Sequence, residues 1–249
     1  MKIFLFSIVV FVNLSCVQTL FHKDIYPSDD LVIKYQQDWQ KTAFNNRVNE
    51  FRNNPIGHNK IVFLGNSIIE AGENWNEKFG VDNIVNRGIS GDFTEGILVR
   101  LDEIIYYKPL AVFILIGIND IFDQHEDREK ITPQYVANNI NQIAKQIQMN
   151  TKDTKIFIQT ILPVDTLLFM KFHNRTLPVY RTSLNDQIKQ INMLIKNNNN
   201  YDIIDLHSVF IDKRGLMNEK YTTDGVHLND LGYSIWVNTI KNDILSMNK

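Results

Sequence analysis

The chain reads Ile61-Val62-Phe63-Leu64-Gly65-Asn66-Ser67-Ile68-Ile69-Glu70 near the end of its first quarter. Four consecutive apolar residues of β-branched and aromatic character are typical of a strand that is buried on both faces. The glycine then permits a sharp turn, and an amphipathic segment long enough for a helix follows, Ile68–Phe79. This stretch predicts a buried parallel strand that leads directly into a helix.

The same alternation recurs along the chain. Short apolar runs and helix-length amphipathic segments take turns, at Asn83–Val85, Thr94–Tyr107, Ala111–Ile116, Tyr135–Met149, Lys155–Ile158, Tyr180–Lys196, Tyr201–Ile204 and Asp230–Leu245. Apolar strands that alternate with helices indicate a parallel sheet covered on both faces, with right-handed crossovers. We therefore expect an α/β fold, a flavodoxin-like three-layer α/β/α sandwich with a five-stranded parallel sheet.

The N-terminus differs from the rest of the chain. Lys2 precedes an apolar run over residues 3–12 that is too short to span a bilayer and matches a secretory signal peptide. A buried first strand or helix is the alternative. We expect a signal peptide over residues 1–16, a helical lead-in of one or two helices over residues 17–58, and one main domain over residues 59–249.

The composition of the chain limits the classes of partner that it is expected to bind. The chain has 26 Lys and Arg against 28 Asp and Glu, with a formal net charge of −2 and no long basic run. Neither nucleic acid nor an anionic membrane surface is therefore expected as a partner. Cys16 is the only cysteine, so an internal disulfide is excluded.

In open α/β sheets, ligands bind beyond the carboxyl ends of the strands, so the reactive side chains are expected in the loops there. Ser67 begins a helix directly after the first strand, where free backbone N–H groups and the positive helix end favour a nucleophile and its oxyanion. Ser67 and Glu70 also fit an S-x-x-E capping box, which is the structural alternative.

Two further loops carry oxyanion-hole candidates. Gly88 and Gly91 lie in the loop after the second strand, where an exposed amide is expected. Helix capping by Asp92 is the alternative there, and phosphate binding is disfavoured because no complete glycine-rich phosphate motif is present. Asn119 follows the third strand and can aim a side-chain N–H at a reacting oxygen, or else serve as an Asx turn or helix cap.

The last loop contains Asp224 three residues before His227. A carboxylate at this spacing can hold the imidazole in one tautomer, which leaves the other ring nitrogen free to accept a serine proton. An ordinary structural histidine is the alternative. A metal site that adds Asp202, Asp205 and His207 is less favoured, because no tight ligand motif such as H-E-x-x-H is present.

Taken together, the four segments resemble the four blocks of the SGNH (GDSL-like) hydrolases, in the branch similar to platelet-activating-factor acetylhydrolases and bacterial carbohydrate acetylesterases. The segments are Gly65-Asn66-Ser67, Asn86–Asp92, Gly117–Asp120 and Asp224–His227. The resemblance implies Ser67 as nucleophile, His227 as base and Asp224 as its partner. It also implies an oxyanion hole of the Ser67 and Gly88 N–H groups and the Asn119 side chain, with no metal and no cofactor. Asn66 replaces the usual Asp of the family.

The resemblance implies hydrolysis of a carboxylic ester through an acyl-enzyme, with an acetyl ester on a carbohydrate as the expected substrate. A lysophospholipase or short-chain lipid esterase is the enzymatic alternative, and a non-catalytic glycan- or ligand-binding protein on the same fold is the alternative of another class. Candidate substrate-binding residues are Asn66, Asp92, Trp75, Phe93 and, in the long loop over residues 161–178, Phe169.

The resemblance of residues 13–16 to a bacterial lipobox makes Cys16 a candidate lipidation site and the only expected route to membrane attachment. Asn13 stands where that motif usually has Leu. We expect an exported protein, either secreted, periplasmic or anchored as an outer-membrane lipoprotein.

Overall fold

The computed structural model describes residues 25–122, 130–197 and 200–247. The expected signal peptide and Cys16 lie outside the described residues. Five parallel strands form one sheet, namely β1 (Ile61–Gly65), β2 (Ile84–Gly88), β3 (Ala111–Leu115), β4 (Lys155–Gln159) and β5 (Asp202–Ile204). Their spatial order is β2-β1-β3-β4-β5, which confirms the predicted doubly wound sheet.

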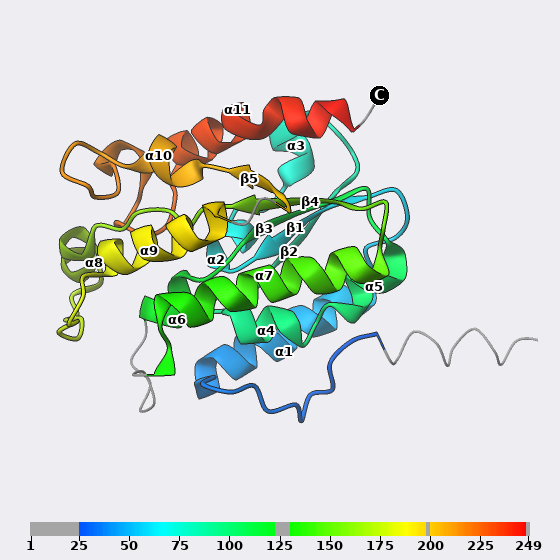
Figure 1. Cartoon of the computed structure of the whole chain (residues 1–249), viewed down its shortest axis with the longest axis horizontal. Coiled ribbons are helices and arrows are strands. Elements are labelled where there is room, and N and C mark those ends of the chain that lie inside the picture. Colours follow the sequence, from blue (N-terminus) through cyan, green and yellow to red (C-terminus); the bar gives the residue numbers. More distant parts are fainter. Residues whose placement is uncertain (1–24, 123–129, 198–199, 248–249) are drawn as a thin grey trace, which may run out of the picture.

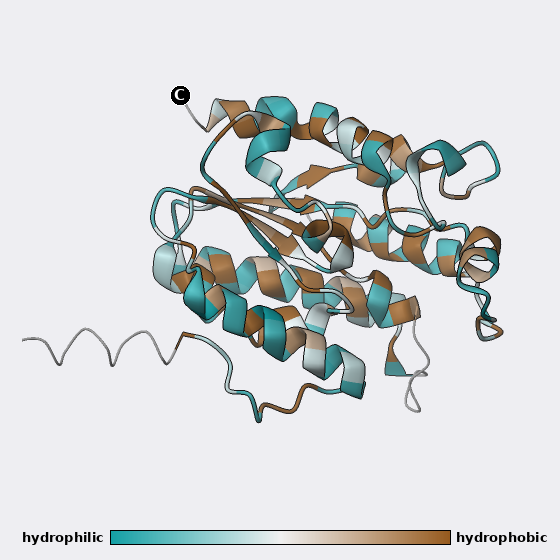
Figure 2. Ribbon diagram, turned by 180° about the vertical axis from the view of Figure 1, so that it is seen from behind, coloured by the Kyte–Doolittle hydropathy of each residue, from teal (hydrophilic) through white to brown (hydrophobic). Residues whose placement is uncertain are grey.

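The sheet is covered on both faces because its central strands are apolar on both sides (Figure 1). Val62 and Leu64 pack into one core, and Ile61 and Phe63 pack into the other. The first core is completed by α4 (Thr94–Leu98), α5 (Asp102–Tyr107), α7 (Pro133–Asn150) and α9 (Leu184–Lys196), and the second by α2 (Ser67–Glu70), α3 (Trp75–Phe79), α10 (Leu206–Phe210) and α11 (Asp230–Ser246). Figure 2 shows the strands as hydrophobic and the long helices as two-faced.

The N-terminal segment adds one helix, α1 (Asp38–Asn53), to this sandwich. Its residues Phe44, Val48 and Phe51 form a third, smaller core with Ile89 and Phe93 from the loop after β2. The helix is thereby fixed beside the carboxyl end of the sheet, where ligands of open α/β folds bind.

Two helices expected to be continuous are broken. The segment Ile68–Phe79 forms α2 and α3, because Trp75 folds back over Gly72 and donates its indole N–H to the Ile69 carbonyl. The segment Thr94–Tyr107 forms α4 and α5, because Arg100 turns inward between them to an ion pair with a buried carboxylate. In both places a tertiary contact overrides the local helical pattern.

The loop after β4 also differs from expectation. It contains α8 (Thr166–His173), which begins at the N-cap Asp165. The short helix α6 (Ile118–Phe122) follows β3. The short helix η3 (Glu219–Tyr221) precedes the final loop. Helix α9 begins at Leu184 rather than Tyr180. Within residues 25–122, 130–197 and 200–247, no helix has the length and apolar character needed to cross a membrane.

Candidate active site

Ser67 occupies the turn between β1 and α2. Gly65 makes this turn feasible, since a Cβ there would lie 2.2 Å from the Leu115 carbonyl oxygen. The helix N-cap is Asn66, whose side-chain oxygen accepts the Ile68 N–H at 3.1 Å. Ser67 is therefore not the capping residue, and its hydroxyl is free to face the open end of the sheet.

His227 meets Ser67 from the loop between η3 and α11. Its Nε2 lies 3.1 Å from Ser67 Oγ, and its Nδ1 lies 2.7 Å from Asp224 Oδ2. Thr222 ties the loop together, because its hydroxyl donates to the His227 carbonyl and accepts the Gly225 N–H. A continuous chain of hydrogen bonds thus runs from the serine hydroxyl to a buried carboxylate.

The Asp224 carboxylate is held by four hydrogen bonds. Oδ1 accepts the backbone N–H groups of Val226 and His227, and Oδ2 accepts His227 Nδ1 and His173 Nε2, the latter at 2.9 Å. Burial by itself raises the pKa of Asp224, but the hydrogen bonds from His227 and His173 outweigh it and hold the pKa far below its ordinary value. Asp224 is therefore ionised whenever His227 works as a base.

Gly88 does not fit the oxyanion role expected for it. Its N–H already donates to the Asn86 side chain at 2.9 Å. A Cβ at Gly88 would lie 2.2 Å from the Glu70 backbone nitrogen, so this glycine permits close packing of β2 against α2. The prediction for Gly88 is wrong because the sequence does not show that a neighbouring side chain occupies its amide.

Gly91 and Asn119 offer donors instead. Gly91 has a φ of +78°, a conformation that favours glycine. Among the described residues, no hydrogen-bond acceptor contacts the N–H of Gly91 or of Ser67. The Asn119 amide donates to the Asp92 carbonyl oxygen at 2.8 Å, which joins the loops after β2 and β3. Asn119 lies within α6, so it is not a helix cap.

Hydrogen bonds between buried polar side chains hold these loops in place. Arg100 donates to Asp92 Oδ2 at 2.8 Å and to the Gly65 carbonyl oxygen at 3.1 Å. Asp120 accepts both the N–H and the hydroxyl of Thr94. Burial raises the pKa of Asp120 to about 7, against the opposing effect of these hydrogen bonds. The ends of β1, β2 and β3 are thereby held in one arrangement.

The five substrate-binding candidates prove to be buried. Each has 6% or less of its surface exposed, and none of them lines the open cleft described below. Trp75 packs with Phe63 and Trp236 in the second core, and Phe93 lies in the small core under α1. Asp92 is engaged by Arg100, Asn66 caps α2, and Phe169 packs edge-on against Phe122. These substrate-binding predictions are wrong, because packing takes up the side chains.

An open cleft of about 680 Å³ lies in front of Ser67 and His227. Its walls are polar and apolar in nearly equal parts, and they come from α1, α2 with the residues after it, and β2 with the loop that follows. They include Arg47, Glu50, Phe51, Asn54, Glu70, Ala71, Glu73, Asn86, Arg87 and Ser90. Arg47 Nε lies 3.3 Å from Glu70 Oε1, and Ser90 donates both its N–H and its hydroxyl to Glu70.

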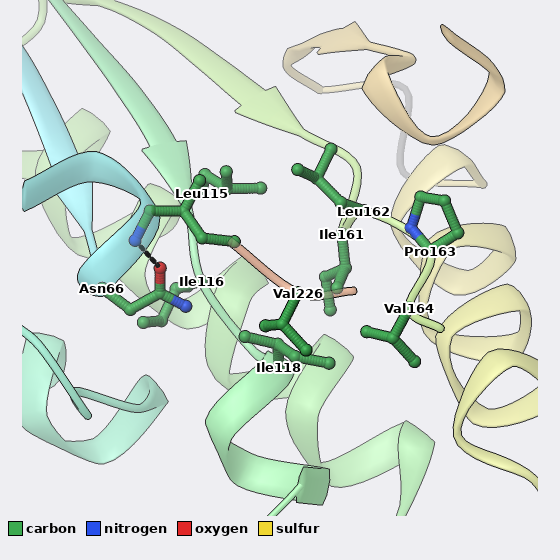
Figure 3. Close-up of a pocket in the computed structure, with 10 residues that line it drawn as sticks. Asn66, Leu115, Ile116, Ile118, Ile161, Leu162, Pro163, Val164 and Val226 are labelled. Carbon is green, nitrogen blue, oxygen red and sulfur yellow. Dashed lines mark hydrogen bonds between the residues drawn. The ribbon is translucent and has the colours of Figure 1, made fainter. Parts of the chain in front are cut away.

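A second cavity, about the size of one water molecule, lies behind the nucleophile (Figure 3). Its walls are aliphatic and include Leu115, Ile161 and Val226. Asn66 Nδ2 points into it and has no hydrogen-bond partner among the described residues. The cavity is too small for a long acyl chain.

Other candidate groups stay apart from this site. Asp205 caps α10 and accepts Lys196 Nζ at 2.7 Å. Within the part of the chain that the structure describes, no three His, Cys, Asp or Glu side chains gather in a way that could hold a metal ion. Arg47 and His173 were not predicted from the sequence, because they belong to helices without a recognisable motif.

Comparison with known proteins identifies the family of the chain. A model of the GDSL-like lipase/acylhydrolase family matches residues 63–235. N-acylneuraminate cytidylyltransferase from Escherichia coli O18:K1:H7 (strain RS218 / NMEC) is 28% identical over 201 residues, which are 78% of this chain but only 42% of that relative. The chain therefore spans less than half of that protein. Platelet-activating factor acetylhydrolase IB subunit alpha1 from Homo sapiens is 22% identical, over 70% of this chain and 71% of its own length.

Solved structures share the fold. A Streptococcus pneumonia structure described as a platelet activating factor has a TM-score of 0.68 and 26% identity, covering 83% of this chain and 95% of its own. An acetylxylan esterase from Geobacillus stearothermophilus has a TM-score of 0.56 and 19% identity, covering 76% and 95%, a likeness of fold alone. Because the family model spans more than half of the sequence, the chain belongs to the GDSL-like lipase/acylhydrolase family of carboxylic ester hydrolases and has the SGNH hydrolase fold.

Proposed function

We propose that this hydrolase is a serine esterase in which Ser67 is the nucleophile, His227 the general base and Asp224 the partner of His227. One observation carries the proposal, namely the hydrogen-bond chain from Ser67 Oγ through the His227 ring to Asp224 at the edge of an open cleft. A nucleophile within reach of a base that is itself oriented by a carboxylate is the arrangement that acyl transfer needs.

In the first half of the reaction, His227 Nε2 takes the Ser67 proton while Oγ forms a bond to the ester carbonyl carbon. The tetrahedral intermediate then expels the alcohol oxygen, which receives the proton from His227, and an acyl-Ser67 ester remains. Water repeats the sequence: His227 takes its proton, the hydroxide adds to the acyl carbon, and Ser67 leaves with the proton returned. The carboxylic acid is released and the enzyme is restored.

The oxyanion of each intermediate needs donors at the carboxyl end of β1. We propose the N–H groups of Ser67 and Gly91 and the second amide N–H of Asn119 for this role, with Gly91 in place of Gly88. The support is that the two backbone groups have no acceptor among the described residues and that Asn119 is attached to the same loop as Gly91. Fixed donors of this kind stabilise a developing negative charge without reorganisation.

The substrate we propose is a short-chain, acetyl-type ester on a carbohydrate. The cleft presents Arg47, Glu50 and Glu73 on the same wall system as the nucleophile, and these groups can hydrogen-bond to sugar hydroxyls. Platelet-activating factor acetylhydrolase and acetylxylan esterase, both similar to this chain, are named for acetyl esters. Release of acetate from acetylated oligosaccharides, with Ser67→Ala as the blank, tests this substrate.

A lipid ester is the second candidate. Leu167 and Phe172 on α8 are 70% and 57% exposed, although both are large and apolar. Such side chains favour contact with an acyl chain or a lipid surface. Hydrolysis rates on p-nitrophenyl esters of increasing chain length separate the two candidates, since the carbohydrate esterase is expected to prefer the acetyl ester and the lipid esterase the longer chains. A binding protein without activity would release no p-nitrophenol from any of them.

We also propose that the protein is exported, on the basis of the apolar run after Lys2. Mass spectrometry of the protein from its native host tests this, because cleavage before or after Cys16 distinguishes a lipoprotein signal from an ordinary one. An uncleaved N-terminus would contradict export by this route.

A further inference from the structure

A second histidine contacts the carboxylate of the proposed triad. His173 Nε2 lies 2.9 Å from Asp224 Oδ2, the same oxygen that accepts His227 Nδ1 at 2.7 Å. His173 is the last residue of α8 and is separated from Asp224 by 51 positions in the chain. The Asp224 side chain is only 5% exposed, whereas those of His173 and His227 are 36% and 38% exposed. One buried oxygen is thus shared by two partly exposed imidazoles.

The position of His173 is fixed by the fold at both ends of α8. At the first turn, the N–H of Asp165 donates to the Gly225 carbonyl at 2.8 Å, which ties the helix to the loop that carries Asp224. At the last turn, the His173 ring packs on Phe169 with the ring centres 4.4 Å apart. Phe169 is itself buried against Phe122. Both ends of α8 therefore contact the loop of residues 222–229, which carries Asp224 and His227.

We infer that His173 is a positioning residue that holds Asp224 in place. This inference rests on the proposed triad. With Nε2–H donating to Oδ2, His173 restricts rotation of the carboxylate. Asp224 Oδ2 thereby stays in line with His227 Nδ1, so that Asp224 can stabilise the imidazolium that forms during the reaction.

Charged side chains of the described residues lie near His173 on α8 and on the loop of residues 222–229. Asp224 and His227 belong to that loop, and Lys171 and Arg175 flank His173 in sequence, with Arg175 over the Phe169 ring. At the start of α8, Asp165 lies 3.7 Å from Arg214. Asp224 is the carboxylate that contacts the His173 ring.

Two substitutions at His173 distinguish the effect of its hydrogen bond to Asp224 from the effect of its ring packing. His173→Phe keeps the packing on Phe169 and removes the hydrogen bond, whereas His173→Gln keeps an N–H of similar reach and removes the titrating group. We expect His173→Phe to lower kcat on p-nitrophenyl acetate by about threefold to tenfold with little change in KM, as fits one hydrogen bond. His173→Gln should recover most of kcat, and the control Lys171→Ala should match wild type.

The proton on His227 Nδ1 gives a readout that does not depend on turnover. Its downfield NMR resonance should shift in His173→Phe and return toward wild type in His173→Gln. A wild-type kcat and a wild-type resonance in folded His173→Phe would overturn the inference. Ser67→Ala, measured in parallel, keeps the two questions apart: if it retains activity, the proposed triad fails, whereas if it is inactive and His173→Phe behaves as wild type, only the role of His173 fails.

Discussion

Ser67 Oγ lies 3.1 Å from His227 Nε2, although 160 positions separate the two residues in the chain. They meet because β1 lies inside the sheet, between β2 and β3, and the loop before α11 returns to its carboxyl end. The order of the strands makes this edge the switch point at which doubly wound sheets bind ligands. The contact is thus a property of the whole fold and of no local segment.

Replacement of Asp224 by Asn tests the tautomer argument. Asp224→Asn should lower kcat by about 10³–10⁴, because an amide no longer requires the proton to stay on His227 Nδ1 and no longer offsets the imidazolium charge. Steady-state kinetics on p-nitrophenyl acetate measure the change, and circular dichroism establishes that the variant is folded. A loss of less than about tenfold would show that Asp224 is not the partner of His227.

Removal of the Asn119 amide tests the oxyanion hole. Asn119→Ala should lower kcat by about 10²–10³ and leave KM nearly unchanged, because the lost N–H acts only once the oxyanion has formed. The variant also loses the hydrogen bond to the Asp92 carbonyl, so its thermal unfolding should be recorded beside the kinetics. If the loss appears in KM rather than in kcat, Asn119 binds the substrate in its ground state.

Arg47 tests the proposed role of the cleft wall. Arg47→Ala should raise KM for an acetylated oligosaccharide by about threefold to tenfold, the value of one polar contact, and should leave the kcat for p-nitrophenyl acetate within about twofold. Arg52→Ala is the matched control, since Arg52 lies on the same helix but binds Asp29 and Asn49 outside the cleft. Equal effects of the two variants would remove the cleft from substrate recognition.

Asp120 gives a prediction for stability. Burial raises its folded pKa to about 7 from 3.8, so between these values the folded state binds more protons than the unfolded state. The free energy of unfolding contributed by Asp120 is therefore highest below pH 4 and falls as pH rises toward 7, by up to about 1 kcal/mol per pH unit.

Urea unfolding of wild type and Asp120→Asn at several values between about pH 5 and pH 8 measures this contribution. The wild-type free energy should fall more steeply with pH than that of the variant, which has no titrating group at this position. Parallel slopes for the two proteins would show that Asp120 is already ionised throughout this range.

The central strands β1 and β3 were predictable because each is a short apolar run buried along its whole length, and such runs need no partner to be recognised. The helix breaks were not predictable, since they depend on where Trp75 and Arg100 find tertiary contacts. A periodic pattern shows which face of a helix is apolar. It does not show that an arginine in the middle of the segment will turn inward to a carboxylate.

Some residues of the candidate site were likewise predictable from the sequence, and others were not. Ser67 stands in a short motif at the end of β1, and Asp224 and His227 stand in a short motif in the loop before α11, which the topology returns to that end of the sheet. Trp75 and Phe93 were predicted to contact substrate, yet an aromatic residue has the same appearance in a sequence whether it packs in the core or faces a cleft. Gly88 and Gly91 lie three residues apart, and only the hydrogen bond from Gly88 N–H to Asn86 shows which of the two amides is occupied.

The central claim is that Ser67 carries the acyl group, and covalent labelling tests it most directly. A fluorophosphonate should modify the folded protein once, at Ser67 as located by mass spectrometry, and abolish ester hydrolysis in proportion to labelling, whereas Ser67→Ala should stay unlabelled and nearly inactive. Full esterase activity in folded Ser67→Ala, or labelling at another residue that abolishes activity, would contradict the account.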